Sequence, residues 1–209
     1  MGNINIDNIW KRGFEDADLL RVEHMCREKA STETDKLIED YIKLEQSRNG
    51  KYISSDLMKL VFPFYAENLE NRRKYNLAIS NSAACLANET FRRQICKPGV
   101  KRCIFVAGAY GAGKSFFIQS LFEKYKENLE QSIVYEGSIT TKSIDGKIDY
   151  AIDNNIEVDM IILNPTFELS LTNIKERANR IGRDVKKEDA VFVYANIYSA
   201  LKRLTEKYK

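Results

Sequence analysis

Residues 102–115 of the chain read RCIFVAGAYGAGKS, and this stretch decides the fold. Its first six residues, 102–107, form a short run of apolar and β-branched side chains, which predicts a strand. The eight residues that follow satisfy the pattern G-x-x-x-x-G-K-[ST] in full, and a helical segment comes after them. Strand, glycine-rich loop and helix therefore stand in the order that a phosphate-binding loop requires. The loop consists of Gly108, Ala109, Tyr110, Gly111, Ala112, Gly113, Lys114 and Ser115.

Each residue type in this loop suits the binding of a nucleotide. Three glycines let the backbone turn tightly, so that its N–H groups can contact phosphate oxygens at the positive end of a helix. We expect Lys114 to reach the β and γ phosphates and the Ser115 hydroxyl to coordinate Mg²⁺ between them. The sequence thus predicts ATP and Mg²⁺ as cofactors. The alternative, a flexible glycine-rich turn before a core helix, gives no reason for the Lys-Ser pair.

Beyond the loop, short β-branched runs alternate with longer amphipathic segments. Strands are predicted at 132–136 and 158–163 in addition to 102–107, with helices between them. This order is typical of a P-loop NTPase-type α/β fold, in which helices flank a parallel sheet. One amphipathic helix is expected to close the chain, because apolar side chains recur at helical spacing from Val191 to Leu204.

The first half of the chain has a different pattern. From Asp16 to about Ile95, apolar residues recur three and four positions apart, which predicts helices. The sequence Cys-Lys-Pro-Gly at 96–99 separates the two halves. We therefore predict an N-terminal helical region over residues 1–98 and a P-loop kinase-like α/β core over residues 99–209.

Composition excludes several classes of protein. With 44% hydrophobic and 30% charged residues, the chain can bury an ordinary core. The excess of 33 Lys and Arg over 30 Asp and Glu is too small to favour nucleic-acid binding. The longest apolar runs are far shorter than the about 20 residues that span a bilayer, and the first ten residues lack a signal-peptide pattern. We expect a cytoplasmic protein without a membrane or nucleic-acid partner, and the cysteine spacing predicts no zinc site.

Residues downstream of the loop indicate the class of reaction. No N-K-x-D motif for guanine occurs. The four apolar residues at 160–163 are followed by Asn164 and Pro165, and not by the Asp-Glu pair of an ATPase motor. A small-substrate kinase is favoured. Glu136 ends the second predicted strand, where α/β sheets build their sites, so it is a site candidate; the alternative is a carboxylate that faces solvent. Residues 172–183, TNIKERANRIGR, predict a helix whose arginines, Arg177 and Arg183 among them, either close over the triphosphate as a lid or form a solvated basic face.

From about Asn71 to Ala195 the sequence resembles the zeta-toxin kinases. The resemblance rests on NRRKYNLAISNSAACLANETFRRQI ahead of the sheet, the loop GAYGAGKS, the segment IVYEGSITT, which is similar to the family's strand ending in Glu-Gly-Thr, and the lid IKERANRIGRDV. It implies an ATP-dependent kinase that phosphorylates the 3′-hydroxyl of the amino sugar in UDP-N-acetylglucosamine, with an antitoxin protein as a possible partner. By the same resemblance, phosphates are handled by Lys114, Arg177 and Arg183, and the sugar nucleotide is contacted by Glu136 and Ser138.

The sequence departs from that family at two points. Family members place a catalytic aspartate on a strand soon after the loop helix, but here only residues 116–131 separate the loop from the next strand. Two carboxylates are near enough in sequence to the end of that strand to replace the aspartate as the general base: Glu136 itself, and Asp145, which could approach the site from the loop after Glu136. The chain also ends at Lys209 where the family adds a strand, so we expect a shortened relative or a fragment. Two alternatives stay open: a catalytically weak or silent ATP-binding regulatory module, and a kinase of another small molecule.

Overall fold

The computed structural model describes residues 2–183 and 185–208, and the chain divides into two compact units. The first unit holds the chain up to Gln94 together with Ile181–Arg183, and the second holds Ile95–Arg180 and the residues after Arg183. The elements of the first unit are η1 (Ile6–Asn8), α1 (Ala17–Thr32), α2 (Thr34–Lys43), η2 (Glu45–Ser47), β1 (Tyr52–Ser54), α3 (Ser55–Met58), η3 (Lys59–Val61), α4 (Pro63–Glu67) and α5 (Leu69–Ile95).

The first unit is mostly helical, as its apolar periodicity predicts. Its first long helix begins at a side-chain cap, because Oδ1 of Asp16 accepts hydrogen bonds from the backbone N–H groups of Asp18 and Leu19, both at 2.9 Å. The short strand β1 was not predicted. It is fixed by the buried Tyr41, whose hydroxyl donates to the Tyr52 carbonyl at 2.9 Å and accepts from the Ser54 N–H at 3.0 Å.

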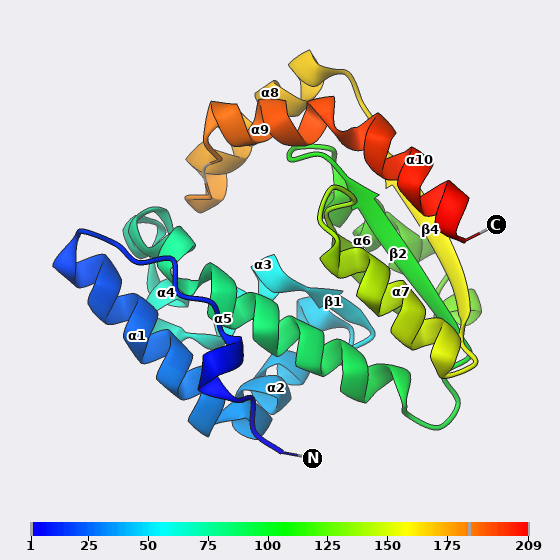
Figure 1. The fold of residues 1–209 in the computed structure, drawn as a ribbon, viewed down its shortest axis with the longest axis horizontal. Coiled ribbons are helices and arrows are strands. Elements are labelled where there is room, and N and C mark those ends of the chain that lie inside the picture. The colour runs from blue at the N-terminus through cyan, green and yellow to red at the C-terminus, as the bar shows by residue number, and fades with distance from the viewer. Residues whose placement is uncertain (1, 184, 209) are drawn as a thin grey trace. The chain divides into compact units, whose positions relative to one another are not determined.

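The second unit is built on three parallel strands. Its elements are β2 (Arg102–Gly108), α6 (Lys114–Lys124), η4 (Glu127–Leu129), β3 (Ser132–Gly137), α7 (Ser143–Asp153), β4 (Glu157–Leu163), α8 (Phe167–Ile181), α9 (Lys187–Ala195) and α10 (Ile197–Lys207) (Figure 1). Strand β2 pairs in parallel with both neighbours, so that Arg102 is opposite Ser132 of β3 and Glu157 of β4. A parallel α/β sheet flanked by helices is therefore confirmed, and each predicted strand agrees with the observed one to within one residue at either end.

The central strand β2 is buried from Cys103 to Gly108. Its apolar and β-branched sequence suits this position, because a central parallel strand is covered on both faces. Phe105 is fully buried, and Ile118 of α6 packs into the same core. The glycine-rich loop thus extends from the best-buried strand of the unit, which gives it a firm base.

The prediction of one closing helix is wrong, because α9 ends at Ala195 and α10 begins at Ile197. Asn196 separates them. Its side-chain Nδ2 donates to the Phe192 carbonyl at 2.7 Å, a local bond that competes with continuation of the helix. The helix α10 then packs on α7, where Lys207 pairs with Asp149 at 2.7 Å.

Within residues 2–183 and 185–208, no helix combines the length and the apolar character that crossing a membrane requires.

Candidate functional site

The glycine-rich loop joins the end of β2 to the start of α6. Gly113 is the N-cap of α6 and carries no side chain that could bond the first N–H groups of the helix, which have no acceptor within it. Gly111 and Gly113 have φ angles of +73° and +83°, in the left-handed region that glycine adopts without steric cost. The loop and the positive end of α6 therefore offer backbone donors to an anion, which fits a phosphate.

Lys114 folds back over the beginning of the loop. Its Nζ donates to the carbonyl oxygens of Gly108 and Ala109, at 3.3 and 2.9 Å. The side chain is half-buried. A partly desolvated ammonium beside backbone donors is suited to binding phosphate oxygens through charge-assisted hydrogen bonds.

Ser115 and Glu136, which the sequence pointed to separately, lie together. Glu136 is near the end of β3 and pairs in register with Val106 of the central strand. The Ser115 hydroxyl lies 3.3 and 3.2 Å from Oε1 and Oε2 of the Glu136 carboxylate and donates to it. Hydroxyl and carboxylate oxygens are hard ligands of the kind that Mg²⁺ prefers, so this donor set fits a magnesium ion shared with nucleotide phosphates.

The residue before Glu136 is a buried phenol. Burial raises the pKa of Tyr135 above its ordinary value, and the negative charge of Glu136 adds to the effect. The ammonium of Lys147 lies 5.1 Å from the centre of the Tyr135 ring. Tyr135 is therefore a neutral packing residue at physiological pH, not a second anionic group beside the loop.

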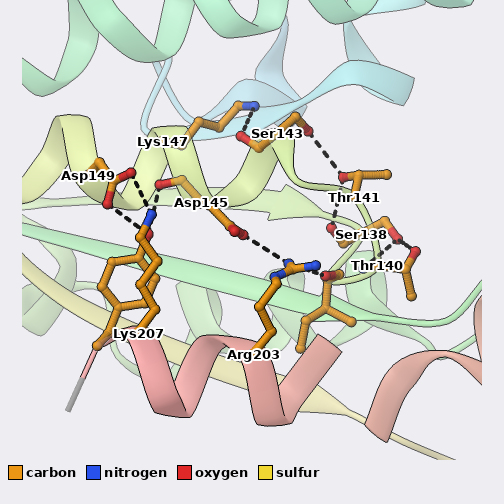
Figure 2. Close-up of polar contacts among 11 residues, drawn as sticks. Ser138, Thr140, Thr141, Ser143, Asp145, Lys147, Asp149, Arg203 and Lys207 are labelled. Carbon is orange, nitrogen blue, oxygen red and sulfur yellow. Dashed lines mark hydrogen bonds and ion pairs between the residues drawn. The ribbon is translucent and has the colours of Figure 1, made fainter. Parts of the chain in front are cut away.

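Ser138 lies in a hydroxyl-rich turn after β3 (Figure 2). Its hydroxyl is 2.9 Å from the Thr140 hydroxyl, and its carbonyl accepts from the Thr141 hydroxyl at 3.2 Å. The Thr141 hydroxyl also lies 3.1 Å from that of Ser143, the first residue of α7. These bonds define the turn, so Ser138 has a structural role in addition to any contact with a substrate.

Asp145, the candidate general base, is in the first turn of α7 and forms an ion pair. Its Oδ1 accepts from Nη2 of Arg203 at 2.9 Å, and the same nitrogen donates to the Ile139 carbonyl at 3.2 Å (Figure 2). Arg203 of α10 thus ties the turn after β3 to α7. Arg203 was not predicted as a site residue, because it is one of several basic residues in an amphipathic helix.

The two lid arginines belong to different units. Arg177 is half-buried on α8 in the second unit, which also contains the loop. Arg183 is assigned to the first unit, where it forms an ion pair with Asp56. Arg183 therefore has a structural partner, and its role in phosphate binding stays a prediction.

Helix α8 packs directly on the loop. A Cβ added at Gly111 would lie 2.2 Å from the carbonyl oxygen of Ser170 and 3.1 Å from Cγ1 of Ile174. Asn173 donates from Nδ2 to the Gly111 carbonyl at 2.8 Å. The predicted helix over 172–183 is thus observed as Phe167–Ile181, and its N-terminal half contacts the loop. No sequence pattern distinguished Asn173 from a surface asparagine.

Comparison with known proteins identifies the family of the P-loop domain. The model of one protein family, described as the KAP family P-loop domain, matches residues 85–204, which is more than half of the chain. In a comparison with curated proteins, none matched. The matched residues include the loop, Glu136 and all three strands of the second unit. The prediction of a P-loop protein is confirmed, whereas the comparison lends no support to the zeta-toxin kinases as the family.

Proposed function

This chain belongs to the KAP family of P-loop NTPase domains, and from this premise we propose that it binds ATP with Mg²⁺ and transfers the γ-phosphoryl group. A P-loop NTPase domain implies nucleotide and magnesium binding in general. The choice of ATP follows from the sequence, which contains no N-K-x-D motif for guanine. The observation that carries the proposal is the pairing of Ser115 with Glu136 beside Lys114.

Each side chain has a part in this proposal. The backbone N–H groups at the start of α6 and the Lys114 ammonium bind the β and γ phosphates. The Ser115 hydroxyl and the Glu136 carboxylate hold the magnesium ion, directly or through water. A magnesium ion held by these two side chains would supply positive charge to offset the negative charge that develops on the phosphates during transfer.

The first experiment measures the dissociation constant of MgATP by titration calorimetry. Lys114→Ala should raise it at least about tenfold, because a charge-assisted hydrogen bond to phosphate is worth about 1.5–3 kcal/mol. Lys124→Ala, at the exposed end of the same helix, is the matched control and should leave the constant unchanged. Equal binding by the Lys114 variant and the wild type would exclude nucleotide binding by this loop.

The second experiment tests the magnesium ligands. In the wild type, ATP should bind more tightly with Mg²⁺ than with EDTA, and this gain should shrink in Glu136→Gln, because an amide is a weaker ligand for a hard cation than a carboxylate. Glu127→Gln, an exposed change in η4, is the control. A magnesium-dependent gain that is unchanged in Glu136→Gln would remove Glu136 from the metal site.

The phosphoryl acceptor separates a hydrolase from a kinase. Water is the acceptor that the NTPase assignment favours. A hydroxyl of UDP-N-acetylglucosamine is the narrower hypothesis, which rests on the zeta-toxin resemblance and on Glu136 and Ser138 at the end of β3. ADP release with and without the sugar nucleotide distinguishes the two, and ATP binding without either reaction would support a regulatory module. An antitoxin partner stays a prediction of the same resemblance.

A further inference from the structure

The contact between α8 and the phosphate loop is unusually close. The backbone of Ser170 approaches Gly111 so closely that no side chain could be placed between them, since an added Cβ would lie 2.2 Å from the Ser170 carbonyl oxygen. Ser170 itself is 2% exposed, and Ile174 on the next turn is buried. Helix α8 therefore packs directly against Gly111, in the middle of the loop.

Asn173 adds a directional bond to this contact. Its Nδ2 donates to the Gly111 carbonyl oxygen at 2.8 Å, and the side chain is half-buried. A carbonyl oxygen can only accept, so the amide nitrogen of Asn173 must face the loop. The bond therefore fixes the direction of the Gly111 carbonyl.

The direction of that carbonyl determines the direction of the next N–H group. Gly111 and Ala112 share a planar trans peptide unit, in which the carbonyl and the N–H point opposite ways. The Ala112 N–H donates to the Ala109 carbonyl at 3.3 Å, and the same carbonyl accepts from Lys114 Nζ at 2.9 Å. A continuous chain of hydrogen bonds thus connects Asn173 to the ammonium that would contact the phosphates.

We propose that Asn173 is a positioning residue for nucleotide binding: it holds the Gly111–Ala112 peptide so that the loop donors and Lys114 are oriented before the phosphates arrive. This inference rests on the proposed function. It does not require Asn173 to touch the nucleotide, and it assigns α8 the role of a fixed support for the loop, in contrast to the mobile lid that the arginines of residues 172–183 suggested. Preorganised donors bind an anion more tightly because less reorientation is needed on binding.

Three substitutions at Asn173 separate the hydrogen bond from other effects. Asn173→Leu keeps the branching at Cγ but removes the donor and adds volume, Asn173→Asp keeps both shape and size but places an acceptor against the carbonyl, and Asn173→Gln retains an N–H donor on a longer side chain. Asn179→Leu, an exposed change on the same helix, is the control. We expect the MgATP dissociation constant to rise about fivefold or more in the Leu and Asp variants, by less in the Gln variant, and not at all in the control.

Hydrogen exchange of residues 109–117 in the absence of nucleotide tests by itself whether the Asn173–Gly111 hydrogen bond holds the loop. Loss of the bond should speed exchange of these amides about threefold or more in the Leu variant, while the melting temperature stays within about 2 °C of the wild type. Two outcomes would overturn the inference. In the first, the Leu variant binds MgATP as tightly as the wild type does, so that only the Asp variant binds more weakly. In the second, the Gln variant binds MgATP as weakly as the Leu variant does. If the wild type binds no MgATP while hydrogen exchange of the loop still depends on Asn173, the proposed function fails, and only the role of Asn173 in holding the loop is supported.

Discussion

Replacement of Gly111 by alanine tests how much of the loop's structure depends on α8. An alanine at φ +73° would cost about 1–2 kcal/mol of folding free energy, because its Cβ crowds the backbone in the left-handed region. The Cβ would also lie 2.2 Å from the Ser170 carbonyl oxygen, at least 1.2 Å inside the 3.4–4 Å of an ordinary contact. Overpacking of this kind costs a further about 1–3 kcal/mol. We therefore expect Gly111→Ala to lower the unfolding free energy of the second unit by about 2–5 kcal/mol.

Gly113→Ala is the matched control for this experiment. Gly113 has a similar φ of +83°, but an added Cβ there would meet nothing within 4 Å. Its substitution should therefore show the backbone cost alone, about 1–2 kcal/mol. Urea unfolding without nucleotide gives both values, followed by circular dichroism and by hydrogen exchange of β2 peptides, since the one tryptophan, Trp10, lies in the first unit. Equal losses in the two variants would show that α8 does not press on the loop, and the reasoning would be refuted.

Three further predictions concern other parts of the chain. Gly146 lies inside α7 with nothing within 4 Å of an added Cβ, so Gly146→Ala should raise the unfolding free energy by about 0.5–1 kcal/mol in urea titrations. Arg183→Ala should lower the stability of the first unit by up to about 1 kcal/mol, measured by Trp10 fluorescence, because it removes one of the two cations that pair with Asp56 and leaves the ion pair with Lys59; lost turnover at unchanged stability would instead support a role in transfer. A hydrogen bond from Lys207, the larger cause, and one from Tyr208 hold the pKa of Asp149 below its ordinary value. The ionised carboxylate therefore stabilises the folded chain above about pH 3.8, and this stabilisation is lost as the pH falls through the lowered pKa. The stability difference between wild type and Asp149→Asn should accordingly shrink on acidification below that pH, and a constant difference would contradict this assignment.

The fold of the second unit could be predicted because local patterns determine it. The motif from Gly108 to Ser115 fixes a strand before it and a helix after it, and β-branched runs mark the remaining strands. The break at Asn196 could not be predicted from apolar periodicity, because it depends on one side chain bonding its own helix. The short strand β1 was missed for a similar reason, since Tyr41, which fixes it, lies on a preceding helix.

Individual site residues could be predicted from the sequence, but the contacts between them could not. Ser115 and Glu136 lie 21 positions apart, and their contact depends on the register in which β3 pairs with β2. Arg183 and Asp56 are 127 positions apart, so no spacing rule indicates their ion pair. The contact of Asn173 with the loop depends on how closely α8 approaches Gly111, a property of the packed unit that no short segment carries.

The strand order of the second unit has a consequence for how the chain folds as it is made. The central strand β2 leaves the ribosome first, yet its partners follow 30 and 55 residues later, since Arg102 pairs with Ser132 and with Glu157. Such non-local parallel pairing is slow, because a long loop must close before any contact is gained. Until β4 is synthesised, Cys103 to Val106 present an apolar strand with an open edge, the kind of segment that pairs with other chains. The strand that supports the loop in the folded unit is thus also the segment most exposed to aggregation during synthesis. A nascent chain halted before Glu157 should therefore aggregate unless a chaperone binds it.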